Sequence, residues 1–86
     1  MGKFDRLIEQ ILNGTSDNNF AFTDLQNVLE YLGFACRIKG SHFIYKKDVF
    51  PERINIQPNG SKAKSYQVRQ VRNLINKYGL GGESDD

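Results

Sequence analysis

The chain has 86 residues, of which 38% are hydrophobic and 26% are charged, and it contains one cysteine and one histidine. This length fits one small domain, and so few cysteines and histidines exclude an internal disulfide and a four-ligand Cys/His zinc site. The net charge is only +2, but residues 34–78 carry +8 whereas residues 1–33 and 79–86 carry −3 each.

The basic block is the charge pattern of a protein that binds a polyanion. Small domains expose many lysine and arginine side chains anyway, so a solvated surface explains the charge equally well. No apolar run is long enough to cross a membrane, and no signal-peptide pattern opens the chain. We therefore expect a soluble cytoplasmic protein that does not bind membranes.

The first half of the sequence predicts two short amphipathic helices. Residues 3–13 place apolar side chains at helical spacing, and Gly14 is positioned to end the helix. Residues 23–33 repeat this pattern, with Thr23 and Gln26 at capping-box spacing and Gly33 at the end.

The apolar period changes to two residues at position 34, which predicts strands at 34–39, 42–46 and 53–57. Cys36 falls on the apolar phase, as expected of a small core residue. The opposite phase predicts a polar sheet face with Arg37, Lys39, Arg53 and Asn55. The phase of the middle strand stays open: if Phe43 and Tyr45 point inward, then His42, Ile44 and Lys46 join this face.

Residues 58–64 form a predicted loop, residues 65–80 a closing helix, and residues 81–86 a disordered acidic tail. The predicted fold is α+β, in the order α-α-β-β-β-α, with helices packed on one face of a three-stranded antiparallel sheet. The domain spans residues 1–80.

The order of several short motifs resembles the HicA family of bacterial and archaeal toxins. The resemblance covers residues 20–80, and the helix at 3–13 lies outside it. It rests on Leu-Gly-Phe at 32–34, Gly-Ser-His at 40–42, the strand at 54–57, and Tyr-Gln-Val-Arg at 66–69.

This resemblance implies a fold similar to the double-stranded RNA-binding domain and ribosome-independent cleavage of mRNA, which inhibits translation and growth. It implies that His42 is the catalytic residue, and that a HicB-type antitoxin binds the active surface. Many members carry a second histidine where this chain has Phe43. If that histidine assists catalysis in them, we expect the activity here to be weaker or differently tuned.

Histidine suits proton transfer during attack of the RNA 2′-hydroxyl on the adjacent phosphate, because both of its protonation states exist near neutral pH. We expect no cofactor and no metal, since Asp48 and Glu52 stand alone in a loop. A second proton carrier is needed, and the sequence does not choose between Tyr45, a lysine and water.

Several residues are candidates for contact with RNA. Lysines at the sheet and before the last helix can bind phosphate, the latter near a helix N-terminus. The candidates are Lys39, Gly40, Ser41, Lys46, Lys62 and Lys64. For Ser41 a turn role is the simpler reading, and for Lys62 and Lys64 a solvated loop is equally compatible. Arg69 and Arg72 are predicted to be solvated or to face the antitoxin.

Two alternative functions use the same features. A non-catalytic module could bind RNA through its shape, its phosphates and its 2′-hydroxyls, as double-stranded RNA-binding domains do. A protein-interaction domain could place the basic surface against an acidic partner. Direct DNA binding is not expected.

Overall fold

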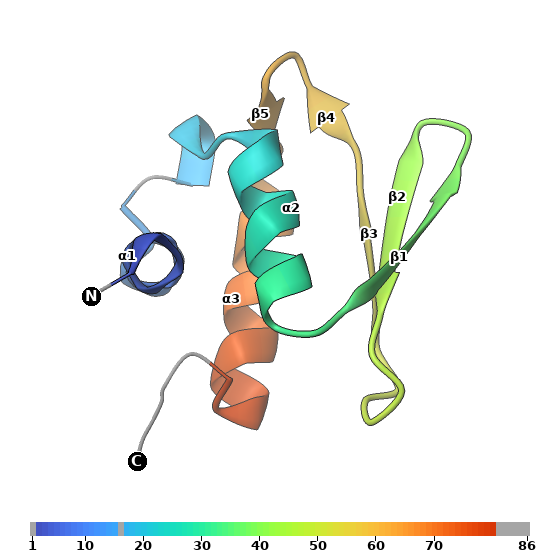
Figure 1. Cartoon of the computed structure of the whole chain (residues 1–86). Coiled ribbons are helices and arrows are strands. Elements are labelled where there is room, and N and C mark those ends of the chain that lie inside the picture. Colours follow the sequence, from blue (N-terminus) through green and yellow to red (C-terminus); the bar gives the residue numbers. More distant parts are fainter. Residues whose placement is uncertain (1, 16, 81–86) are drawn as a thin grey trace.

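The computed structural model describes residues 2–15 and 17–80, apart from the side chain of Lys3. It confirms the predicted α+β fold, and it places the helices on one side of the sheet (Figure 1). The elements are α1 (Lys3–Asn13), the 3₁₀ helix η1 (Asp17–Asn19), α2 (Phe22–Tyr31), β1 (Ala35–Lys39), β2 (His42–Lys46), β3 (Arg53–Ile56), β4 (Pro58–Asn59), β5 (Lys62–Ala63) and α3 (Ser65–Tyr78). The predicted disordered tail, residues 81–86, lies outside the described residues.

The main sheet is an antiparallel meander in the order β1-β2-β3. Phe43 pairs with Ile56, and Tyr45 pairs with Ile54 across the β2–β3 ladder. Ile54, Ile56 and Tyr45 are buried, so this side of the sheet faces the helices. The register therefore settles the open phase of the middle strand and places His42 on the outer face.

The core lies between the sheet and helices α2 and α3, and α1 packs on the far side of these helices (Figure 1). Burying one large aliphatic side chain contributes about 1.5–3 kcal/mol. The fully buried aliphatic residues are Ile11, Leu25, Val28, Leu29, Ile54, Ile56, Val68, Val71 and Ile75. None of the described helices is both long and apolar enough to span a bilayer.

Arg72 ties α1 and η1 to α3. Its guanidinium donates to both carboxylate oxygens of Asp17, at 3.0 and 3.2 Å, and to the carbonyl oxygen of Ile11 at 3.0 Å. The prediction that Arg72 is solvated or faces a partner is therefore wrong, because the first helix folds back onto this side of α3. Arg69 is exposed as predicted.

Strand β1 forms an edge of the sheet, and none of its residues is buried. Cys36 is exposed, so its predicted place in the core is wrong. It does lie on the same side of the sheet as its partner Tyr45, but the hydrophobic core does not extend as far as the edge strand. Period-two alternation predicts a side chain's direction, and burial additionally requires an element packed on that side.

Helix α2 begins without the predicted capping box, since no side chain caps its N-terminus. The predicted loop at 58–64 instead contains the two-stranded ribbon β4–β5. Its backbone satisfies the helix start, because the amide of Phe22 donates to the carbonyl of Ser61 at 3.0 Å. The ribbon thus supplies a hydrogen-bond acceptor at the start of α2, a role that the sequence spacing had assigned to the side chain of Thr23.

Candidate nucleic-acid interface

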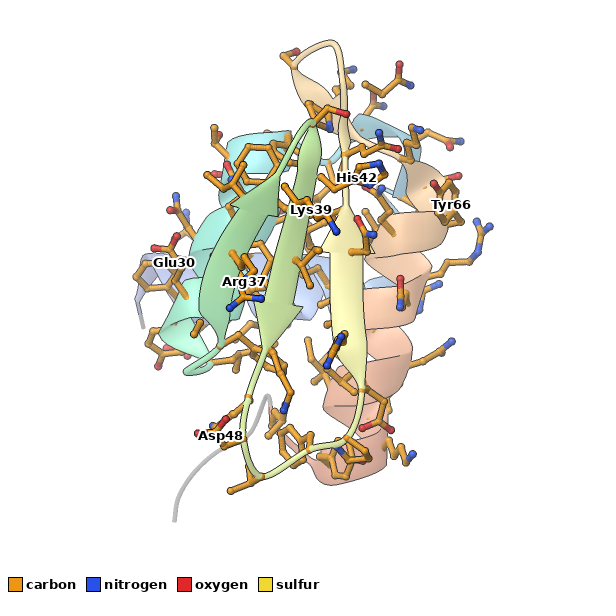
Figure 2. The ribbon with its side chains drawn as sticks, turned by 90° about the vertical axis from the view of Figure 1, so that its right-hand side faces the viewer. Glu30, Arg37, Lys39, His42, Asp48 and Tyr66 are labelled. Carbon is orange, nitrogen blue, oxygen red and sulfur yellow. The ribbon has the colours of Figure 1, made fainter. Side chains whose placement is uncertain are left out.

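The outer face of the sheet presents side chains in rows that cross the strands (Figure 2). Lys39 pairs with His42 in the row next to the β1–β2 turn, and Arg37 pairs with Ile44 in the next row. The third row joins Lys46 to Arg53. Figure 2 shows Arg37, Lys39 and His42 on the side of the molecule away from the helices. We call this surface, with Asn55, the cationic face.

The cations of the cationic face make no ion pair within the described part of the chain, although Asp48 lies at the edge of the face. Strands β1, β2 and β3 contain no aspartate or glutamate. Neither described ion pair involves a residue of this face: one joins Arg72 to Asp17 and the other joins Lys77 to Glu52. A hollow on the face is lined by Ala35, Cys36, Arg37, Ile44, Lys46, Asp48 and Arg53. Such a concave basic surface favours a polyanion.

His42 is exposed, and its ring is held by Asn55 from the neighbouring strand. The His42 Nδ1 lies 3.0 Å from the Asn55 Oδ1. An amide oxygen only accepts hydrogen bonds, so this orientation assigns the proton to Nδ1 and leaves a lone pair on Nε2 in the neutral ring. The arrangement presents a base at Nε2 and fixes the plane of the imidazole.

Gln57 approaches His42 from the end of β3. Its Nε2 donates to the Ser41 Oγ at 3.1 Å and lies 3.5 Å from the His42 Nε2. The buried side chain of Gln67 holds the Gln57 main chain from the other side, and it is only 1% exposed. In the orientation that satisfies both amides, Gln67 donates to the Gln57 carbonyl at 3.2 Å and accepts from its N–H at 2.9 Å.

The structure brings four of the predicted RNA-binding residues to the cationic face or its rim. Gly40 has a φ of 61°, a conformation that favours glycine, and it makes the tight turn that places Ser41 beside His42. Lys39 lies directly across from His42, and Lys46 lies further along β2 on the same face. These positions agree with a common binding surface.

Lys62 and Lys64 lie apart from these four residues. The Lys62 Nζ donates to the Asn19 Oδ1 at 2.6 Å, so its ammonium is directed toward η1. Lys64 is half-buried just before α3, and its Nζ lies 6.0 Å from the centroid of the exposed Tyr66 ring. Neither lysine therefore lies on the cationic face, and Lys64 stands beside Tyr66 at the start of α3.

Tyr45 does not fit the second proton carrier that the sequence left open. It is fully buried on the helix side of the sheet, opposite to His42. Burial raises the pKa of its hydroxyl, which makes the proton harder to remove. Among the described residues, the side chains that hydrogen-bond with His42 are the amides Asn55 and Gln57, and neither titrates.

Sequence reasoning placed Asn55 on the polar face but missed its contact with His42, and it missed the roles of Gln57 and Gln67. The alternation of the third strand predicts that the side chains of Asn55 and Gln57 lie on its polar side. Which residues they contact depends on the register between strands. A buried glutamine on an amphipathic helix leaves a weaker signal, because Gln67 reads as a polar position near a helix start.

Within residues 2–15 and 17–80, no three His, Cys, Asp or Glu side chains gather in a way that could hold a metal ion. No protein family, curated protein or solved structure matches the chain.

Proposed function

We propose that the protein is the toxin of a toxin–antitoxin pair, a metal-independent endoribonuclease that cleaves mRNA and inhibits translation and growth. One observation carries this proposal: an exposed histidine, oriented through Nδ1 by Asn55 and with Nε2 beside the Gln57 amide, lies on a face whose cations make no ion pair among the described residues. A proton acceptor beside a surface for phosphates is what RNA cleavage by its own 2′-hydroxyl requires. The resemblance to HicA toxins favours the same activity.

In this mechanism the His42 Nε2 takes the proton of a 2′-hydroxyl while the 2′-oxygen attacks the adjacent phosphorus. The bond to the 5′-oxygen breaks, which leaves a 2′,3′-cyclic phosphate and a 5′-hydroxyl. Because the site is open, water supplies the proton to the leaving oxygen. Lys39 and Arg37 stabilise the charge on the phosphate. Proton transfer by a positioned histidine contributes typically about 10²–10⁴-fold.

We assign the partner as a HicB-type antitoxin that covers the cationic face and presents acidic side chains to it. The cations of this face, which have no ion-pair partner among the described residues, support an acidic contact surface, since burying them without partners is costly. The antitoxin and the mRNA would then compete for the same residues. Bound antitoxin should therefore protect RNA from cleavage and should itself be displaced by high salt.

The test compares His42→Ala with Arg69→Ala, which removes an exposed cation on α3 outside the cationic face. Each variant is induced without antitoxin, and purified protein is incubated with RNA in EDTA. We expect the wild type and Arg69→Ala to arrest growth and cleave RNA, and His42→Ala to do neither. Equal mRNA depletion by His42→Ala would contradict the proposal.

A second candidate is a non-catalytic RNA-binding module. It is favoured by the absence, among the described hydrogen-bond partners of His42, of a second titratable group. This function predicts salt-sensitive RNA binding, no cleavage in any buffer, and a small effect of His42→Ala on affinity. Cleavage of purified RNA in EDTA distinguishes the two functions.

A further inference from the structure

Tyr66 is an aromatic side chain without a role in the core. The residue stands in the first turn of α3 and is 52% exposed. Its neighbour Gln67 is buried, so the helix start is anchored while the ring projects outward. Its described side-chain contact is the cation of Lys64, 6.0 Å from the ring centroid. Packing therefore does not explain a large, rigid ring at this position.

Tyr66 is connected to the histidine site through the backbone. Gln67 holds the main chain of Gln57, and the Gln57 side chain reaches Ser41 and His42. In Figure 2, Tyr66 lies beyond the β3 edge of the sheet at the level of His42. A nucleic-acid strand that crosses the cationic face past His42 would leave the sheet beside this ring.

We propose that Tyr66 and Lys64 form a stacking site for one unpaired RNA base, next to the phosphate that lies at His42. This inference rests on the proposed function and specifies its substrate as RNA that is single-stranded at the cleaved position. The base stacks on the exposed ring face, and the Lys64 ammonium, close to the ring, neutralises the neighbouring phosphate.

A stacking site of this kind distinguishes unpaired RNA from duplex RNA. In a duplex each base is stacked on its neighbours, so its face is not available to a protein side chain. An unpaired base is accessible to an aromatic ring, and stacking tolerates any base because each has a π-face. The cationic face alone would bind both forms through their phosphates. Tyr66 therefore adds a preference for unpaired RNA that charge cannot supply.

The experiment uses full-length protein with His42→Ala, which prevents cleavage during binding. The affinity is measured for a short fluorescent RNA, single-stranded or annealed to its complement. Tyr66→Ala and Tyr66→Phe are compared with Tyr31→Ala. The control Tyr31 is 55% exposed, like Tyr66, but stacks on Phe4 of α1 at 4.7 Å between ring centroids. Circular dichroism melting confirms that each variant is folded.

We expect Tyr66→Ala to weaken binding of single-stranded RNA about 5- to 150-fold. Tyr66→Phe and Tyr31→Ala should bind it as the parent does, and duplex binding should not change. Unchanged single-strand affinity in Tyr66→Ala, or equal losses for single-stranded and duplex RNA, would overturn the inference. If the wild type cleaves RNA but Tyr66→Ala does not change the affinity, the stacking site is wrong and the proposed nuclease stands. If Tyr66→Ala weakens binding but the wild type cleaves no RNA, the nuclease is wrong and the stacking site stands.

Discussion

The side-chain amide of Gln67 and the main chain of Gln57 satisfy each other, with contacts of 3.2 and 2.9 Å. Gln67 is the one buried polar side chain in the described part of the chain, at 1% exposure. Its contact continues the hydrogen bonding of the sheet beyond Ile56, where β3 ends. The helix thereby fixes the residue whose side chain touches both Ser41 and His42.

The first prediction concerns this contact. Gln67→Leu keeps a buried side chain but leaves the Gln57 N–H and carbonyl unpaired, which costs about 1–3 kcal/mol. We expect a matching loss in the free energy of unfolding measured in urea, and faster hydrogen exchange at the Gln57 amide. The exposed Gln70 on the same helix gives the control Gln70→Leu. Equal stability of the two variants would show that the contact contributes nothing.

The second prediction concerns the orientation of His42. Asn55→Ala removes the acceptor of the Nδ1 proton, so the ring can rotate and Nε2 loses its fixed direction. We expect RNA cleavage to fall, but by no more than in His42→Ala. Asn76→Ala, at an exposed position of α3, is the control. Nitrogen NMR of the imidazole should show mixed tautomers in Asn55→Ala, and an unchanged tautomer would refute the assignment.

The fold could be predicted from the sequence because its apolar periods are regular. The helix stripes and the alternation around Ile54 and Ile56 each specify a buried side that the structure confirms. The contact between His42 and Asn55 could not be predicted, because it depends on strand register rather than on spacing along the chain. Cys36 shows the same limit, since nothing in its own strand indicates that the strand lies at an edge.

Polar contacts between residues far apart in the chain could not be predicted from the sequence either. Arg72 has the spacing of a solvated helix position, yet it is bound by Asp17, which lies in the segment after α1. No local pattern tells that this segment returns to α3. The exposure of Tyr66 could not be predicted from the sequence either. It stands out only because the structure shows that the adjacent residue Gln67 is buried.

The third prediction concerns the cationic face. Because its cations have no ion-pair partners in the described residues, each is free to release counterions from RNA. For single strands the logarithm of the binding constant falls by about 0.7 per phosphate contact for each unit of log salt. Arg37→Ala and Arg53→Ala should each reduce this slope by about 0.7, whereas Arg69→Ala should not. Equal slopes in all three variants would exclude the face as the RNA surface.

The fourth prediction concerns the attachment of α1. Arg72→Met keeps most of the apolar stem but removes the donors to Asp17 and Ile11. Both charged side chains are mostly shielded, at 19% and 15% exposure, so the loss should be about 1–3 kcal/mol of unfolding free energy. Hydrogen exchange should accelerate in α1 before it does in β2. Protection that is unchanged in α1 would mean that its apolar face alone holds it.

The fifth prediction concerns acid stability at the far end of the molecule. Glu52 accepts hydrogen bonds from Lys77 and Tyr78, and these contacts lower its pKa from 4.5 to about 2. A carboxyl whose pKa is depressed in the folded state stabilises the fold at any pH above its pKa in the unfolded state. This contribution is lost as the pH falls toward its pKa in the folded state. The wild type should therefore lose its advantage over Glu52→Gln between about pH 4.5 and pH 2.

Carbon NMR of the Glu52 carboxyl measures this pKa directly. Lys77→Met removes the largest cause of the shift, so the pKa should rise toward 4.5 while the hydrogen bond from Tyr78 keeps part of the depression. The Phe50 ring stacks on Tyr78 at 3.9 Å between centroids and should keep the loop in place in this variant. Titration near 4.5 in the wild type would show that these contacts do not persist in solution.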